Sequence, residues 1–215
     1  MKYIYNFKEK IIVNLKIISL ILCAFILASC ASVQAPQQSK VIENYQQLTT
    51  QPDGSRAYIG KNIYSYNLIK IFPSKFHPDT SSKNPTVKEN EVKSLLQDFD
   101  NALNHELIST RFSITQEVEP NSICIQPYIT SIILTKNWLN VATSAMLLGP
   151  VSHGGATTAI DAYDCNTKQR VAAEVRDTRA SVFSELSSSY STTGHTQIEI
   201  KNAAKSFANL LISYK

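Results

Sequence analysis

Two segments with helical periodicity enclose a series of strand-like segments, and this order is the feature that most limits the fold. Apolar residues repeat at helical spacing between residues 88 and 107 and again between 200 and 214. Strand-like runs occupy residues 64–72, 111–118, 122–135, 156–163 and 170–183. The order predicts an α+β domain, in which a long amphipathic helix and a C-terminal helix pack on a mostly antiparallel sheet.

Two turn signatures predict two hairpins. Glu119-Pro120-Asn121 separates the second strand-like run from the third, and residues 164–168 separate the fourth from the fifth. Residues 64–72 carry apolar side chains at both odd and even positions, which is typical of a central strand covered on both faces. The expected sheet is therefore one central strand followed by two hairpins.

Three further segments connect or extend these elements. Thr86 precedes Glu89 by three residues, which matches a capping box at the start of the first helix. Residues 139–148 suit a short helix or strand packed under the sheet, and their length is far below a membrane span. Contact of this segment with the membrane surface is the alternative. Residues 185–194 are rich in Ser and Thr, and we expect them to be mobile.

The first 29 residues have the pattern of a signal peptide. Four lysines precede the apolar stretch Ile17–Leu27, which is too short to cross a bilayer. We therefore expect residues 1–29 to be removed rather than folded. The remaining chain is long enough to bury the core of one domain.

Leu27-Ala28-Ser29-Cys30 resembles the lipobox of bacterial lipoprotein signals. The resemblance implies a diacylglycerol thioether on Cys30, cleavage between Ser29 and Cys30, and acylation of the new amine. A thiol is the strong nucleophile that lipid transfer needs. The alternative is an ordinary cleaved signal peptide with an incidental cysteine. Cys23 competes poorly because the bulky residues Leu20-Ile21-Leu22 precede it.

Residues 30–53 are rich in Gln, Ser, Thr and Pro, so we expect a lipidated N-terminus and a flexible tether there. Residues 54–215 are expected to form the single α+β domain. Ala31 follows Cys30 at the position where some lipoproteins that stay in the inner membrane have Asp. Resemblance to known sorting signals therefore favours the inner leaflet of the outer membrane, with the domain facing the periplasm.

The charge of the chain gives no support to nucleic-acid binding. The formal charge of +4 falls to about +1 without the four lysines and one glutamate of residues 1–29. Basic and acidic residues are interspersed in the remaining chain, as on a solvated surface. A nucleic-acid partner is therefore not expected.

Two cysteines remain after Cys30, namely Cys124 and Cys165. An envelope space outside the cytoplasm allows them to oxidise. Cys124 lies in a strand-like run and Cys165 in a predicted turn, so we expect a disulfide if the two strands are close. Two buried free thiols are the alternative.

Three stretches of the chain carry a resemblance to a known family. The first runs from Asp53 to Ile59 and from Tyr66 to Pro73, the second from Arg111 to Ile114 and from Ile125 to Ile132, and the third from Gly154 to Ala156, Asp164 to Lys168 and Asp177 to Ala180. They resemble the uncharacterised bacterial lipoproteins of domain of unknown function 3313 over roughly residues 45–214. The chain departs from the family at Asn166-Thr167-Lys168, where the family tends to have a glycine. The resemblance implies fold and location, and no chemistry.

No pattern indicates a catalytic or metal site. His153-Gly154-Gly155 is superficially similar to an oxyanion-hole loop, but no G-x-S-x-G accompanies it, and a turn before a strand explains both glycines. His77, His105, His153 and His195 show no metal-ligand spacing. We therefore expect no enzyme activity, no metal and no cofactor other than the covalent lipid on Cys30.

Six tyrosines lie near predicted strands and turns, where they could form a contact surface or pack in the core: Tyr58, Tyr64, Tyr66, Tyr128, Tyr163 and Tyr190. The leading hypothesis is a lipid-anchored domain that binds an envelope protein or glycan. One alternative is an envelope hydrolase that uses the acidic residues of the late hairpin, Asp161, Asp164, Glu174 and Asp177. Another is a structural subunit that self-associates through a sheet edge, and the oligomeric state stays open.

Overall fold

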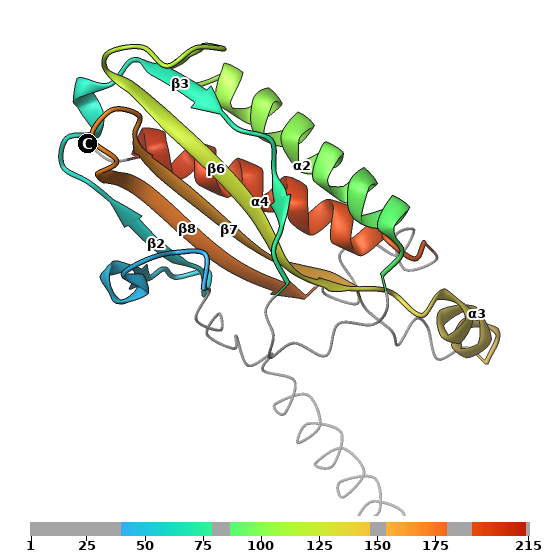
Figure 1. The fold of residues 1–215 in the computed structure, drawn as a ribbon. Helices are drawn as coiled ribbons and strands as arrows, with labels where there is room; N and C mark the ends of the chain where they lie inside the picture. Colours follow the sequence, from blue (N-terminus) through green and yellow to red (C-terminus); the bar gives the residue numbers. More distant parts are fainter. Residues whose placement is uncertain (1–39, 79–86, 147–153, 180–190, 214–215) are drawn as a thin grey trace, which may run out of the picture. The chain divides into compact units, whose positions relative to one another are not determined.

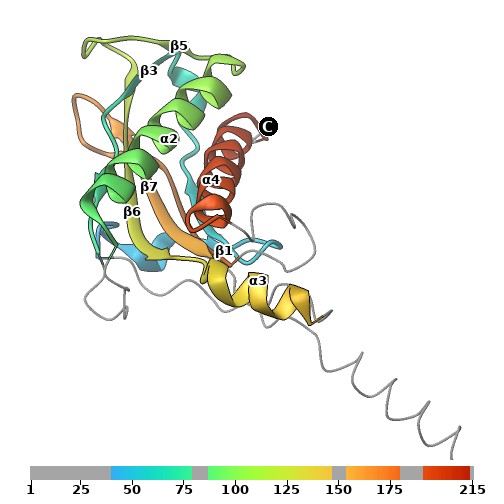
Figure 2. The same cartoon turned by 90° about the vertical axis from the view of Figure 1, so that its right-hand side faces the viewer.

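The structure is a computed structural model that describes residues 40–78, 87–146, 154–179 and 191–213. The expected signal peptide, Cys30 and the first ten residues of the expected tether lie outside these ranges. Residues Gln34–Lys215 form one compact unit. Within it, one sheet is packed on one side by two long helices (Figures 1 and 2). The predicted α+β fold with a mostly antiparallel sheet is confirmed.

The sheet has the strand order β1-β2-β8-β7-β6-β3-β5, and β4 pairs beside β6 outside this path. The strands are β1 Thr49–Thr50, β2 Arg56–Ile59, β3 Leu68–Ile71, β4 Lys75–Phe76, β5 Ser113–Ile114, β6 Ser122–Ile133, β7 Gly155–Asp164 and β8 Arg170–Arg179. β7 pairs antiparallel with both β6 and β8, which confirms the late hairpin. The three long strands form the rigid centre of the sheet.

Helices α2 (Glu89–Ile108) and α4 (Gly194–Ser213) lie side by side on what we call the helix face (Figure 2). Each helix buries the apolar stripe that the periodicity predicts, and the largest fully buried side chains include Phe99 of α2 and Phe207 of α4. Thr86 lies outside the described residues. The N-terminus of α2 is capped instead by Glu91, whose Oε2 accepts a hydrogen bond from the Lys88 backbone N–H at 3.1 Å.

The predicted first hairpin is wrong. β5 does not pair with β6; instead β3 lies between them and runs parallel to both. The reason is the crossover: α2 carries the chain back across the sheet, so the strands that follow it run parallel to the strand that precedes it. β3 is also next to the sheet edge, not central, and only Ile69 in it is fully buried.

Residues 40–53 belong to the folded domain, which corrects the predicted tether. Ile42, Tyr45 and Leu48 are buried against the face of the sheet opposite the helices, which we call the open face. Tyr45 begins a short 3-10 helix, η1 Tyr45–Gln47, and Ile42 and Leu48 lie on either side of it, before β1 pairs with β2. Three apolar residues at three-residue spacing were enough to attach this polar segment, because burying each one stabilises the attached state by about 1.5–3 kcal/mol.

Residues Asn137–Ala145 form helix α3, one of the two elements predicted for this segment. Contrary to the prediction, it is not packed under the sheet: it extends beyond the end of β6 (Figure 1), and Val141 is 57% exposed. Among the described residues, no helix is long and apolar enough to cross a membrane.

Candidate binding cleft on the open face

A polar cleft of about 520 Å³ opens beside the N-terminal segment. Three parts of the chain line it: the segment around η1, the corner after β2, and the turn between β7 and β8. The lining residues are Glu43, Asn44, Gln47, Tyr58, Gly60, Lys61, Asn62, Lys168, Gln169 and Arg170. None of them is aliphatic, so the cleft offers hydrogen bonds and charge rather than apolar surface.

Arg170 joins the N-terminal wall of the cleft to the sheet. Its Nε donates to Asp161 Oδ1 at 2.7 Å and its second terminal nitrogen to Asp161 Oδ2 at 3.2 Å, a bidentate pair. The other terminal nitrogen donates to the backbone carbonyl of Glu43. The Arg170 side chain is only 13% exposed, and it fixes the position of the segment on β7.

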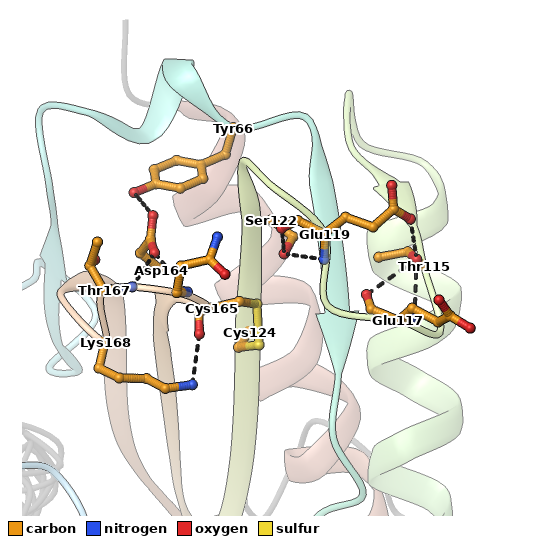
Figure 3. The surroundings of a disulfide bond; sticks show 11 residues. Tyr66, Thr115, Glu117, Glu119, Ser122, Cys124, Asp164, Cys165, Thr167 and Lys168 are labelled. Carbon is orange, nitrogen blue, oxygen red and sulfur yellow. Dashed lines mark hydrogen bonds between the residues drawn. A yellow bond between two sulfur atoms is a disulfide. The ribbon is translucent and has the colours of Figure 1, made fainter.

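The turn between β7 and β8 is fixed by Asp164 (Figure 3). Its Oδ1 accepts hydrogen bonds from the backbone N–H groups of Asn166, at 2.9 Å, and Thr167, at 2.7 Å. Tyr66 donates its hydroxyl proton to Asp164 Oδ2 at 2.9 Å. The N–H of Thr167 in particular holds the pKa of Asp164 below its usual range, and burial next to this carboxylate raises the pKa of Tyr66 to about 12.

A disulfide ties the same turn to the sheet. Cys124 of β6 is bonded to Cys165, and the two Cα atoms are 5.0 Å apart (Figure 3). Lys168 takes up a left-handed backbone conformation with φ 62°, a conformation that glycine adopts more readily than other residues. Its Nζ donates to the Cys165 carbonyl at 2.7 Å. The cleft wall is therefore cross-linked, capped and hydrogen-bonded before any ligand arrives.

Gly60 forms the corner after β2, where the backbone approaches β8 closely. Its N–H donates to the Val171 carbonyl at 2.7 Å. A Cβ atom at this position would lie 3.2 Å from that carbonyl oxygen and 2.9 Å from Asn62 Oδ1. The absence of a side chain thus brings the Lys61-Asn62 corner against the turn on the other side of the cleft.

Three of the six singled-out tyrosines lie on the open face. Tyr58 and Tyr128 pack against its apolar cluster, and Tyr163 lies near Asp161. Burial and the nearby Asp161 carboxylate raise the pKa of Tyr128 and Tyr163. Tyr66 is buried on the helix face and Tyr64 is 51% exposed beside Arg111, whereas Tyr190 lies outside the described residues. The predicted contact surface is therefore reduced to three partly buried rings.

The four carboxylates of the late hairpin are not brought together. Asp161 and Asp177 belong to the open face, but Asp177 pairs with Thr157, four residues from Asp161 along β7. This spacing corresponds to about 13 Å along the strand, more than a pair of catalytic carboxylates spans. Asp164 caps the turn, and Glu174 points to the other side of the sheet.

Glu174 is buried between β8 and α4. Its Oε1 accepts hydrogen bonds from Ser206 at 2.6 Å and from Arg176 at 3.3 Å. Arg176 also pairs with Asp53. Burial raises the pKa of Glu174, while its other oxygen has no hydrogen-bond partner. Burial acts in the same direction on Asp53, but hydrogen bonds from Ser55 and the Arg176 guanidinium hold the pKa of Asp53 below its usual range.

Close packing or surface exposure accounts for the glycine and histidine candidates that the structure describes. A Cβ on Gly154 would lie 2.9 Å from the Ile133 carbonyl oxygen and 3.1 Å from His195 Cβ, so close packing requires the glycine. His105 is exposed beside Glu106, and His77 is exposed. His153 lies outside the described residues. Within the described ranges, no group of three His, Cys, Asp or Glu residues could hold a metal ion.

Sequence reasoning missed the cleft because its two walls are distant in the chain. The sequence pattern places Arg170 at the start of a predicted strand and Glu43 in the predicted tether. The available signal was the spacing of Ile42, Tyr45 and Leu48, which is regular enough to indicate a docked segment. Nothing in the sequence pointed to the specific bond between Arg170 and the Glu43 carbonyl.

The chain is similar to solved structures with which it shares little sequence. A PelC L103M dodecamer from Paraburkholderia phytofirmans is 10% identical with a TM-score of 0.39, over 74% of this chain and 93% of that one. Hypothetical protein CT253 from Chlamydia trachomatis is 8% identical with a TM-score of 0.42, over 69% of this chain and 99% of that one. No curated protein matches.

A family model described as "Protein of unknown function (DUF3313)" matches residues 37–208. The match begins close to the segment that docks on the open face and ends within α4, so it covers α2, most of α4 and every strand of the described residues. The chain therefore belongs to the DUF3313 family.

Proposed function

We propose that this chain is a bacterial lipoprotein whose folded domain binds a ligand of the cell envelope without catalysing a reaction. Cys30 carries the lipid after cleavage behind Ser29, and the anchor lies in the inner leaflet of the outer membrane. The support is the lipobox and the alanine that follows it. The domain then faces the periplasm, a space in which a disulfide such as Cys124–Cys165 persists.

The cleft composition favours a polar, acidic ligand. Amide side chains both donate and accept hydrogen bonds, and Asn44, Gln47, Asn62 and Gln169 provide four of them. Lys61 and Lys168 outnumber the single acidic lining residue, Glu43, while the charge of Arg170 is balanced by Asp161. A glycan with carboxylate or phosphate groups presents the matching hydroxyls and negative charge, so we assign this class of ligand to the cleft.

The single observation that carries the binding function is the fixed wall of this cleft. The disulfide and the hydrogen bonds of Asp164 hold the turn in place, so binding costs little conformational entropy there. The hydrolase alternative has no comparable support, since its four carboxylates face different surroundings.

Lipid attachment is tested by the mass of the N-terminal peptide and by membrane fractionation. Cys30→Ala should abolish both the lipid mass and the membrane retention of the chain. Cys23→Ala is the matched control, because it removes a cysteine from the same region without touching the cleavage site, and it should behave as wild type. An unmodified Cys30 in the mature protein would refute the anchor.

Ligand binding is tested with soluble, carboxylate-bearing fragments of the cell-wall glycan, by calorimetric titration of the full chain. Lys61→Ala combined with Gln169→Ala should weaken binding about tenfold or more, because both exposed side chains line the cleft. Lys75→Ala combined with Gln97→Ala changes the same residue types elsewhere on the surface and should have no effect. Equal affinities for the two double variants would refute the cleft as the binding site.

A further inference from the structure

Helix α3 has its polar and apolar sides reversed relative to a helix packed on a core. Asn140 is fully buried, and Thr143 and Ser144 are half-buried. Asn137 at the start of the helix is exposed, but the exposed positions after it are apolar: Val141, Ala142, Ala145 and the adjoining Met146. These four residues form the α3 outer face. Val141 is 57% and Met146 is 70% exposed, so two of the large exposed hydrophobic residues of the domain are adjacent here.

The charge around this face suits a lipid surface with anionic headgroups. No Asp or Glu occurs between Glu119 and Asp161, and Lys136 directly precedes the helix. A helix that buries its apolar side at the headgroup boundary gains hydrophobic free energy, and the lack of carboxylates avoids repulsion. A nine-residue helix is too short to span a bilayer, so contact would occur only at its surface.

The length of chain between Cys30 and the folded domain keeps the domain near the anchor. The described fold begins at Lys40, and ten residues reach at most about 36 Å even when fully extended. The connection therefore keeps the whole domain, and with it the α3 outer face, close to the membrane in which Cys30 is anchored.

We propose that the α3 outer face rests on the surface of the membrane in which Cys30 is anchored. This inference rests on the proposed lipid anchor. Weak insertion of the helix is then sufficient, because the anchor already holds the domain at the membrane and raises the effective concentration of α3 there. Contact through the α3 outer face would orient the domain, so that the open face stands at a fixed angle to the membrane.

The test uses Trp138, the single tryptophan of the chain, which lies in α3. The full chain, purified from membranes with its lipid, is reconstituted into phosphatidylethanolamine and phosphatidylglycerol vesicles that contain acyl chains brominated at shallow positions. Wild type should show tryptophan quenching. Val141→Glu combined with Met146→Glu should reduce the quenching about tenfold, because two charges would enter the headgroup boundary.

Val118→Glu combined with Ile108→Glu is the matched control, since both residues are exposed. Val118 lies shortly before the start of β6 and Ile108 before β5, whereas α3 follows the end of β6. It should be quenched as wild type. A lipidated wild-type chain that shows no quenching overturns the membrane contact and leaves the anchor intact. A chain without lipid mass that fails to bind vesicles overturns both. A dimer in sedimentation that depends on Val141, without quenching, assigns the face to a second copy and also overturns it.

Discussion

The two faces of the sheet are covered by different elements and different kinds of side chain. The helix face is closed by α2 and α4 over a continuous cluster that includes Phe99, Phe207 and several fully buried isoleucines. Among the described residues, the segment 41–48 covers the open face and places Ile42, Tyr45 and Leu48 on a small cluster of alanine and valine. Tyrosines, an ion pair and the cleft occupy the rest. The helix face supplies most of the hydrophobic stability, and the open face leaves polar groups accessible.

The largest expected effect lies in the centre of the helix face. Phe99→Ala removes a fully buried ring from α2 and should lower the free energy of unfolding by about 3–5 kcal/mol. Chemical denaturation followed by circular dichroism measures this value. Ile108→Ala, on the same helix but 71% exposed, should change it by less than about 0.5 kcal/mol. Similar losses for both variants would mean that the helix face is not the main core.

The disulfide should rank next. Replacing Cys124 and Cys165 together with Ser removes a cross-link between residues 41 apart, and the unfolded chain gains loop entropy worth about 3–4 kcal/mol. Thermal unfolding of the variant and of reduced wild type measures the loss. The two should agree, and the glycan fragments should bind both more weakly because the cleft wall is released. Unchanged unfolding on reduction would indicate that the two thiols are not bonded.

A substitution on the open face should change the local stability of its segment as well as the free energy of unfolding of the whole domain. Leu48→Ala should cost about 2 kcal/mol, at the low end for a buried leucine, because the small cluster under it can partly collapse. Amide hydrogen exchange should also accelerate in residues 41–50 before it does in α2, since the segment can detach alone. Gln46→Ala, exposed in the same turn, is the control and should leave exchange unchanged. Uniform acceleration over the whole domain would contradict the idea of a separately attached segment.

The smallest expected effect is a change in pH dependence. Because burial raises the pKa of Glu174, the folded protein binds this proton at a higher pH than the unfolded chain does. Stability contributed by this group is therefore present at low pH and is lost as the pH rises from the ordinary glutamate value through the raised one. Glu174→Gln should remove this loss, by at most about 1.4 kcal/mol per pH unit.

Denaturation of both proteins across the acidic to neutral range measures the difference between their slopes. The difference isolates Glu174, because Asp53, whose lowered pKa makes it act with the opposite sign, titrates in both proteins. A variant with the same slope as wild type would mean that Glu174 releases its proton at the same pH in the folded and the unfolded chain.

The helix face was far easier to predict than the open face. Periodicity located both long helices, because a stripe such as Leu95, Phe99 and Leu103 recurs within one segment. Strand pairing was less accessible: Glu119-Pro120-Asn121 is a genuine turn signature, yet the strands that it joins are separated by β3. The partner of a strand is chosen by the whole sheet, and local turn chemistry could not indicate the insertion of a strand from earlier in the chain.

The open face depended on contacts that no local pattern encodes. The bond between Arg170 and the Glu43 carbonyl joins two segments that look polar and unremarkable in the sequence. The residue type, the expected envelope location and the predicted strand and turn positions indicate Cys124 and Cys165 as a possible pair, and the adjacency of β6 and β7 supplies the geometry. Prediction thus succeeded for cysteine, a residue type with few structural roles, and failed for the arginine, a common residue type that has a specific partner here.

The strand order also dictates when the domain can be completed. β2 has only two neighbours in the sheet, β1 and β8, and Arg56 of β2 pairs with Val175 of β8. The N-terminal edge therefore cannot close until more than half of the chain has followed it into the same compartment. A chain that is anchored in a membrane at Cys30 would be anchored next to the segment that is among the last to acquire its final hydrogen bonds.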